Sequence, residues 1–67
     1  MNNSYVLLRM YDFLNEGKEI RINDCCGEYD LSLSTFRRYI AFLRGYYGEM
    51  YGKEIVYDPE REVYVLK

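Results

Sequence analysis

The sequence contains no histidine and no tryptophan, and it has a single proline. Without histidine the chain lacks the side chain most often used as a general base near neutral pH and as a metal ligand. Its carboxylates are scattered and form no recognisable catalytic set. Gly45, Gly48 and Gly52 follow no strand pattern and lack the lysine and Ser or Thr of a phosphate-binding loop. We therefore expect no enzyme, no catalytic residues, no cofactor and no metal site.

The only two cysteines are the neighbours Cys25 and Cys26. Adjacent cysteines cannot easily meet disulfide geometry, and without histidine or a second cysteine pair a zinc site is not expected. The sequence also lacks a charged flank ahead of an apolar run, and no segment approaches about 18 apolar residues. These absences predict two reduced thiols, no signal peptide, no membrane contact and a cytoplasmic location.

The composition is typical of a folded domain, with 49% hydrophobic residues in a chain of 67. A chain of this length forms one domain at most, so residues 1–67 are expected to form a single domain. Nine tyrosines accompany three phenylalanines. Tyrosine combines a large apolar ring with a polar hydroxyl, which suits a small core that lies close to water everywhere.

The segment at residues 31–47, LSLSTFRRYIAFLRGYY, predicts a two-faced helix opened by Ser32 as its N-cap. Its apolar stripe consists of Phe36, Ile40, Leu43 and Tyr47, and its opposite face consists of Ser34, Arg37, Arg38, Ala41 and Arg44. Three arginines and no acid lie between residues 31 and 48, in a chain whose net charge is −2. Such a helix can rest on a core while its other face meets phosphates and base edges.

Three shorter elements are predicted ahead of this segment, and the first two are a helix and a strand. Residues 4–16 form a first helix, with N-cap side chains available at residues 2–4 and Gly17 at its end. Its apolar positions are Leu7, Met10, Tyr11 and Leu14. Residues 18–22, KEIRI, alternate apolar and charged side chains and predict a short strand or extended connector. This strand is too short to stand alone, so we expect it to pair with a later hairpin.

Residues 23–30 are predicted as a second helix, with Asn23 or Asp24 able to cap or favour its first turn. Ile22, Cys25, Cys26 and Tyr29 carry its apolar spacing. Leu31 then supplies an apolar residue in the turn before Ser32. The resulting order is helix, short turn and basic helix.

The glycines predict that the third helix, at about residues 33–47, ends between Gly45 and Tyr51. Residues 55–66 are predicted to form a hairpin with strands at 55–57 and 63–66. Its turn is a type I turn with Pro59 at the second position, within DPER.

This order of elements resembles the winged helix-turn-helix domain at the amino end of DeoR-type and WYL-domain bacterial transcription regulators. The resemblance covers nearly the whole chain. It rests on Leu14, Gly17, Ile20, Ile22, Cys25, Tyr29, Leu31, Ser32, Thr35, Phe36, Arg37, Arg38, Ile40 and Leu43, and on Ile55, Tyr57, Asp58, Tyr64 and Leu66 in the hairpin. It implies an α+β fold of three helices and a small antiparallel sheet with a C-terminal β-hairpin wing.

The chain departs from this family at three places. Tyr39 stands where the family usually has an aspartate that can orient the arginine before it, so Arg38 is expected to be held differently. About four additional residues separate Leu43 from Ile55, roughly one helical turn. Glu60 and Glu62 surround Arg61 where the family tends to have glycine and basic residues, which weakens the case for wing contact with DNA.

The resemblance and the basic helix predict a duplex DNA-binding transcriptional regulator, or its reader domain, with the third helix in the major groove. The candidate DNA-binding residues are Ser32, Leu33, Ser34, Thr35, Arg37, Arg38, Arg44 and Arg61. Arginine suits guanine O6 and N7, and Leu33 could contact a thymine methyl. Arg44 is equally consistent with a phosphate contact and with a solvated side chain. A purely solvated face also remains open for Arg37 and Arg38.

The expected partner is double-stranded DNA, bound by a homodimer or by part of a longer regulator, and no small-molecule site is evident. The alternative is a winged helix used as a protein interaction module: a dimerisation domain, a polymerase partner or an antagonist of a regulator. Acidic charge outside the third helix and the tyrosines Tyr46, Tyr47 and Tyr51 favour this alternative. A simpler explanation for these tyrosines is packing of the third helix against the hairpin.

Overall fold

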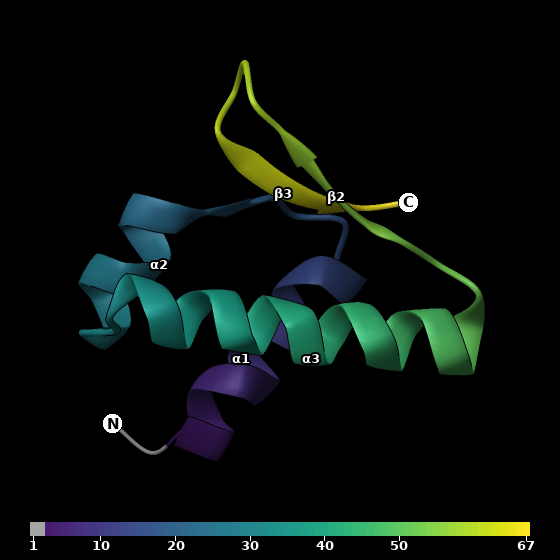
Figure 1. Ribbon diagram of the computed structural model, residues 1–67, viewed down its shortest axis with the longest axis horizontal. Coiled ribbons are helices and arrows are strands. Elements are labelled where there is room, and N and C mark those ends of the chain that lie inside the picture. The colour runs from purple at the N-terminus through teal and green to yellow at the C-terminus, as the bar shows by residue number, and fades with distance from the viewer. Residues whose placement is uncertain (1–2) are drawn as a thin grey trace.

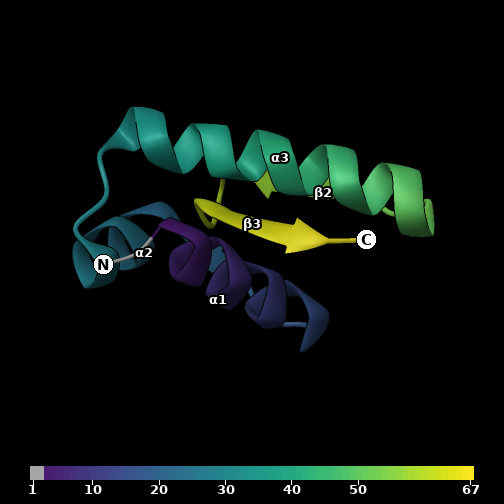
Figure 2. The same ribbon diagram turned by 90° about the horizontal axis from the view of Figure 1, so that it is seen from below.

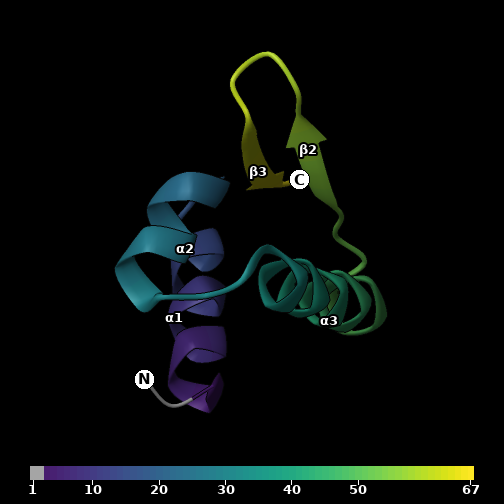
Figure 3. The same ribbon diagram turned by 60° about the vertical axis from the view of Figure 1, so that its left-hand side comes forward.

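The computed structural model describes residues 3–67, and this part of the chain folds into three helices and a three-stranded antiparallel sheet (Figure 1). The elements are α1 (Asn3–Asn15), β1 (Ile20–Arg21), α2 (Ile22–Tyr29), α3 (Leu33–Tyr51), β2 (Ile55–Asp58) and β3 (Val63–Leu66). The predicted α+β class and order of elements are confirmed. Seen from below, β3 shows behind the gap between α1 and α3 (Figure 2), and the hairpin rises to one side of both helices (Figure 3).

Helix α1 contributes one side of the core. Met10 and Leu14 are buried as its spacing predicts, whereas Leu7 and Tyr11 are only half-buried. Val6, which the predicted stripe omitted, is fully buried. Gly17 follows the helix with φ of +77°, and the Lys18 amide donates to the Phe13 carbonyl, so glycine ends α1 as predicted. The predicted capping role of Asn2 lies outside the described residues.

The three strands form a sheet in the order β1-β3-β2. Ile20 pairs with Tyr64 and Arg21 with Val63, which confirms that the short segment after α1 adds a third strand to the hairpin. The strand is shorter than predicted because Ile22 already begins α2. Only two residues of β1 therefore pair, and Ile20 is the one that enters the core.

Helix α2 begins one residue before its predicted start, and its cap is not the predicted one. Arg21 occupies the N-cap position without a side-chain hydrogen bond, so Asn23 lies inside the helix and Asp24 lies in its first turn. Asp30 ends the helix in the left-handed conformation, with φ of 55°, and the Leu31 amide donates to the Cys26 carbonyl. Residues 30–32 then form a three-residue connection to α3.

Helix α3 is longer than predicted. Gly45 and Gly48 lie within it, and it ends only at Gly52, which has φ of 63°. The Gly52 amide donates to the Gly48 carbonyl and the Lys53 amide to the Tyr47 carbonyl, which satisfies the last turn. The helix therefore passes the predicted boundary near Tyr47 and ends at Tyr51, the last residue of the predicted range, because tertiary contacts hold the last turns in place despite the low helix propensity of two glycines.

Those contacts come from a tyrosine cluster, defined as Tyr11, Tyr46, Tyr47 and Tyr51. The ring of Tyr11 in α1 stacks on Tyr47 at 5.5 Å and meets Tyr46 edge-on at 5.8 Å, and Tyr46 and Tyr47 both contact Tyr51. The Tyr47 hydroxyl lies 2.9 Å from Asn15 Oδ1 and 3.1 Å from the Tyr11 carbonyl. The cluster therefore joins α3 to α1, a contact that the sequence did not predict, and Tyr47 also shares the core with Ile55 of the hairpin.

The C-terminal hairpin forms as predicted. Ile55 pairs with Leu66 and Asp58 with Val63, which leaves residues 59–62 as the loop. The Asp58 carboxylate accepts hydrogen bonds from the amides of Glu60 and Arg61, a local bond that favours a turn. Glu62 completes the loop with φ of 55°, a conformation that costs a residue with a side chain more than it costs glycine.

The predicted stripe of α3 lies in the core. Its members Phe36, Ile40, Leu43 and Tyr47 are all buried, and no charged side chain is buried among residues 3–67. The Phe36 ring also contacts Tyr64 of β3 at 5.7 Å, so the stripe touches the sheet as well as α1. Within the described residues, no helix has both the length and the apolar character needed to cross a membrane.

Replacing Glu62 by glycine should stabilise the hairpin. The substitution removes the Cβ strain of the left-handed conformation, about 1–2 kcal/mol, and adds backbone entropy to the unfolded chain of about 0.5–1 kcal/mol. We expect the free energy of unfolding in urea to rise by roughly 0.5 kcal/mol. Glu60→Gly is the matched control, because it removes the same charge at a position without positive φ, and it should lower stability.

The Tyr47 hydroxyl should make stability depend on alkaline pH. Burial raises its pKa to about 12 from an ordinary value of 10, so the unfolded chain loses this proton first. Stability from this group is complete below pH 10 and declines as pH rises toward 12. Unfolding measured between these values should show a shallower decline for Tyr47→Phe than for the wild type, while Tyr57→Phe, on the exposed part of β2, should keep the wild-type slope.

Candidate nucleic-acid interface

The candidate residues at the start of α3 form a small hydroxyl cluster. Ser32 caps the helix as predicted, since its Oγ accepts a hydrogen bond from the Thr35 amide at 3.2 Å. The same Oγ donates to Thr35 Oγ1 at 2.9 Å and lies 3.3 Å from Ser34 Oγ. Ser32 and Thr35 thus hold the first turn, while Ser34 and Leu33 are exposed beside them. The cap therefore leaves Ser34 and Leu33 as the exposed side chains that can meet a ligand.

Arg37 and Arg38 follow this turn on the exposed side of α3. In the part of the chain that the structure describes, neither makes an ion pair or a hydrogen bond through its guanidinium. The other arginines all have partners within that part. The two guanidinium groups next to Ser34 therefore keep their full donor capacity for a ligand outside the chain.

Arg44 has a partner inside the fold. Its Nε and Nη2 atoms donate to the Ile55 carbonyl of β2 at 3.4 and 3.3 Å. This contact connects α3 to the first residue of the hairpin. The position is still exposed, but the guanidinium is partly used, which separates Arg44 from Arg37 and Arg38.

Arg61, the candidate at the tip of the hairpin, is also engaged. Its guanidinium pairs with the Glu19 carboxylate, which precedes β1. The Arg61 carbonyl accepts a hydrogen bond from Arg21 Nη1 at 2.9 Å. These bonds fasten the loop to the β1 edge, and they leave Glu60 and Glu62 as the exposed charges beside Arg61. The tip is therefore acidic in character, as the sequence suggested.

Tyr39, which stands where the regulators that the sequence resembles usually have an aspartate, points into the core. It is 7% exposed, and its hydroxyl is buried without a hydrogen-bond partner among the described residues. Burying a hydroxyl without a hydrogen bond costs free energy. Tyr39 therefore stabilises the core through the packing of its ring and not through its hydroxyl. It does not orient Arg38, because no hydrogen bond between the two side chains is present.

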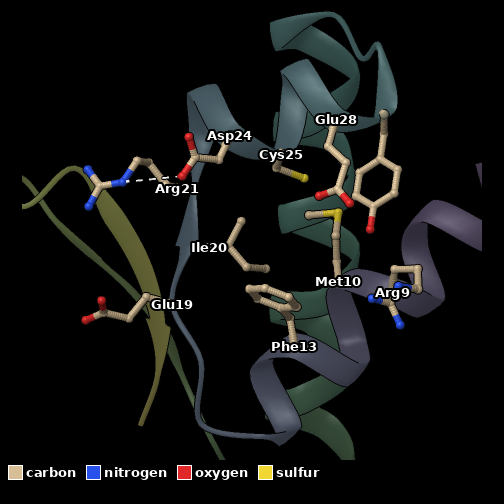
Figure 4. Close-up of a pocket in the computed structure, with 10 residues that line it drawn as sticks. Arg9, Met10, Phe13, Glu19, Ile20, Arg21, Asp24, Cys25 and Glu28 are labelled. Carbon is tan, nitrogen blue, oxygen red and sulfur yellow. Dashed lines mark ion pairs between the residues drawn. The ribbon is translucent and has the colours of Figure 1, made fainter.

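A cavity of about 260 Å³ lies between α1, β1 and α2, away from the start of α3 (Figure 4). Its apolar floor is formed by Met10, Phe13, Ile20 and Cys25, and its charged rim by Arg9, Glu19, Arg21, Asp24 and Glu28. Burial raises the pKa of the Cys25 thiol to about 11, so it is protonated and weakly nucleophilic near neutral pH. Arg21 Nε lies 3.7 Å from Asp24 Oδ2 at the rim.

Two charges of that rim, Arg21 and Asp24, pair with each other, while Glu19 pairs with Arg61 of the hairpin. The Arg9 guanidinium is hydrogen-bonded to Tyr29, which raises the pKa of Arg9. No set of three or more His, Cys, Asp and Glu side chains among residues 3–67 is arranged to hold a metal ion. No sequence pattern predicts this cavity, because its walls come from three elements that meet only in the fold.

A second hollow was also missed from the sequence. An apolar groove of about 340 Å³ runs between α1 and α3 and is lined by Leu7, Leu8, Tyr11, Phe42, Leu43 and Tyr46. A signal for it exists in the sequence, since Phe42 and Tyr46 recur four residues apart beside the predicted stripe. The spacing alone does not show that Leu8 of α1 lies opposite them, because Leu8 is more than 30 positions away in the sequence.

Comparison with known proteins identified no relative of this chain. The sequence matches no protein-family model, no curated protein and no solved structure. The case for a function therefore depends on the geometry of the residues described above.

Replacing Arg44 should affect the fold, whereas replacing Arg37 should not. Arg44→Met keeps the apolar stem but removes both bonds to the Ile55 carbonyl, and we expect the free energy of unfolding to fall by about 0.5–1 kcal/mol. Arg37→Met is the matched control on the same helix and should leave stability unchanged. Urea unfolding monitored by tyrosine fluorescence measures both. Equal stability of the two variants would show that the Arg44 contact contributes nothing.

Proposed function

We propose that this chain is a winged helix-turn-helix domain that binds duplex DNA in transcriptional control, with the amino-terminal half of α3 in the major groove. Helix α2, the three-residue connection and α3 have the order and turn length of a helix-turn-helix, and a hairpin follows. The amino end of α3 lies clear of the hairpin tip, which rises from the middle of the molecule (Figure 1).

The observation that carries this proposal is the pair of unpartnered arginines. Arg37 and Arg38 lie within the first two turns of α3, next to the exposed hydroxyl of Ser34. Arginine reads guanine O6 and N7 through two parallel hydrogen bonds, and serine bonds to phosphate or base. The positive end of the helix dipole adds attraction for a phosphate at the same end.

The acidic residues of the hairpin tip leave α3 as the main surface for the proposed contact with DNA. No acid lies on α3 before Glu49, whereas the hairpin tip carries Glu60 and Glu62 and its arginine is paired with Glu19. An acidic tip near the DNA backbone would repel phosphate. The hairpin therefore adds little to affinity, and a single copy of the domain should bind weakly.

A second candidate function is a protein interaction module that does not read DNA. The observation in its favour is the apolar groove between α1 and α3, where Leu8 and Phe42 are exposed. This function places the working surface on a different side of α3 from Arg37. The two candidates therefore predict different effects of salt and of arginine substitutions.

Selection from a random duplex library should enrich a motif, and binding to that motif can then be measured by fluorescence anisotropy. We expect Arg37→Ala and Arg38→Ala each to weaken binding about tenfold, since an arginine contact to a base is worth about 1–3 kcal/mol. Arg9→Ala removes the same charge from α1 and should have a much smaller effect. All three variants should unfold at nearly the wild-type temperature, because none of these side chains is buried.

Binding to the selected duplex should also weaken steeply with salt, with a log–log slope of about −0.9 for each phosphate contacted. Arg37→Ala and Arg38→Ala should lower this slope if they remove phosphate contacts, and relax base preference if they remove base contacts. The proposal fails if no motif is enriched and no salt-dependent binding is detected. That result would favour the protein interaction module.

A further inference from the structure

One side of the molecule, shared by α1 and α3, is apolar and uncovered. Leu8 and Phe42, at the rim of the groove between these helices, are 63% and 65% exposed and are the most exposed large apolar side chains among the described residues. Figure 3 shows α3 nearly end-on, with α1, α2 and the hairpin on its inner side and no element on its outer side. Exposed apolar surface that is continuous over two helices is typical of a protein interface.

The outer side of α3 carries the repeat of a helix-pairing seam. Arg38, Phe42, Gly45 and Glu49 recur at intervals of four, three and four residues, which is the spacing of core positions in a coiled coil. If a second copy of α3 runs antiparallel with position 42 opposite position 45, Phe42 faces Gly45 of the second copy. In the same register, Arg38 faces Glu49 of the second copy. The seam is therefore complementary to itself.

The size of Gly45 supports this pairing. Glycine is unfavourable inside a helix, and nothing in the fold requires one here, since a Cβ at Gly45 would meet no atom within 4 Å. Opposite a phenylalanine of a second copy, the missing side chain makes room for the ring. Ala41 of both copies lies on one flank of the seam and Tyr46 of both copies on the other, so the Phe42–Gly45 contact is the one that pairs a large residue with a small one.

The two charged residues of the seam, Arg38 and Glu49, have no ion-pair partner within the described part of one copy. They lie eleven residues apart on one helix, about 16 Å along its axis, too far to reach each other. In the antiparallel pair each meets its opposite, which places two ion pairs on either side of the apolar centre and favours this orientation over a parallel one.

We infer that this face binds a second copy of the chain, giving a two-fold symmetric dimer in which the α3 helices pack antiparallel with Phe42 on Gly45. A two-fold axis perpendicular to α3 leaves Arg37 of both copies on the same side of the pair. Arg38 lies at the edge of the interface. The dimer forms through contacts that do not involve DNA, so it can be tested separately from the proposed function.

Sedimentation equilibrium of the full chain without DNA, from micromolar to submillimolar concentration, tests the dimer. The wild type should form dimers, and Phe42→Ser should raise the dissociation constant about tenfold or more, as expected for a central aromatic contact. Phe42 is exposed, so the variant should stay folded, which circular dichroism checks. Tyr57→Ser, which removes an exposed aromatic from β2, should dimerise like the wild type.

The two glycines of α3 provide a second matched pair. Gly45→Ala and Gly48→Ala improve helix propensity equally, but only Gly45 lies in the seam. Gly45→Ala should raise the dissociation constant about fivefold through overpacking against Phe42 of the second copy. Gly48→Ala adds a Cβ 3.9 Å from the Lys53 carbonyl, in ordinary contact, and should leave dimerisation unchanged.

Charge reversal tests the register. Arg38→Glu and Glu49→Arg each bring like charges together across the antiparallel pair, so each variant alone should be mostly monomeric. An equimolar mixture should form heterodimers, because every facing pair is then opposite in sign. A monomeric wild type at all concentrations would overturn the inference. So would single charge variants that dimerise as well as the wild type, or a mixture that stays monomeric.

Discussion

The packing of α3 on α1 is the contact on which the rest of the structure depends. Phe36, Ile40, Leu43 and Tyr47 present one continuous apolar stripe to Val6, Met10 and Leu14. A domain of this size buries about 60% of its unfolded surface, a smaller share than a larger domain buries, so one such stripe supplies much of its stability. Tyr47 strengthens the carboxyl end of the stripe through its ring contact with Tyr11 and its hydroxyl beside Asn15. This anchoring explains how α3 continues through Gly45 and Gly48.

An extended α3 separates two exposed surfaces along one helix. Its first turns carry Arg37 and Arg38 with no internal partner, and its outer side carries Phe42 and Gly45. The two surfaces share Arg38, which lies four residues before Phe42, whereas Arg37 lies about 100° further around the helix. The nucleic-acid surface is therefore centred on Arg37 and Ser34, and the seam for a second copy on Phe42 and Gly45. Acidic charge lies on the hairpin tip, on the rest of the body and, on α3, at Glu49.

Sequence patterns predicted most of the fold and part of the site. Ser32 was identified as the cap of α3, and Ile20 was expected to pair with the hairpin, because capping and strand patterns are local in sequence. The last turn of α3 and the contact of the tyrosine cluster with Tyr11 were not predicted, since both depend on contacts between residues more than 30 positions apart. The exposed pair Leu8 and Phe42 was missed for the same reason.

The sequence by itself determined the order of elements, the buried stripe of α3 and the position of the basic residues. Helical and strand periodicity depend only on residues that are close together in the sequence. Only the tertiary structure decided which arginines are free. Arg61 meets Glu19 and Arg44 meets the Ile55 carbonyl because the chain folds back on itself, and no local pattern encodes those distances. Arg37 and Arg38 stand out because, among residues 3–67, neither guanidinium has an ion-pair or hydrogen-bond partner.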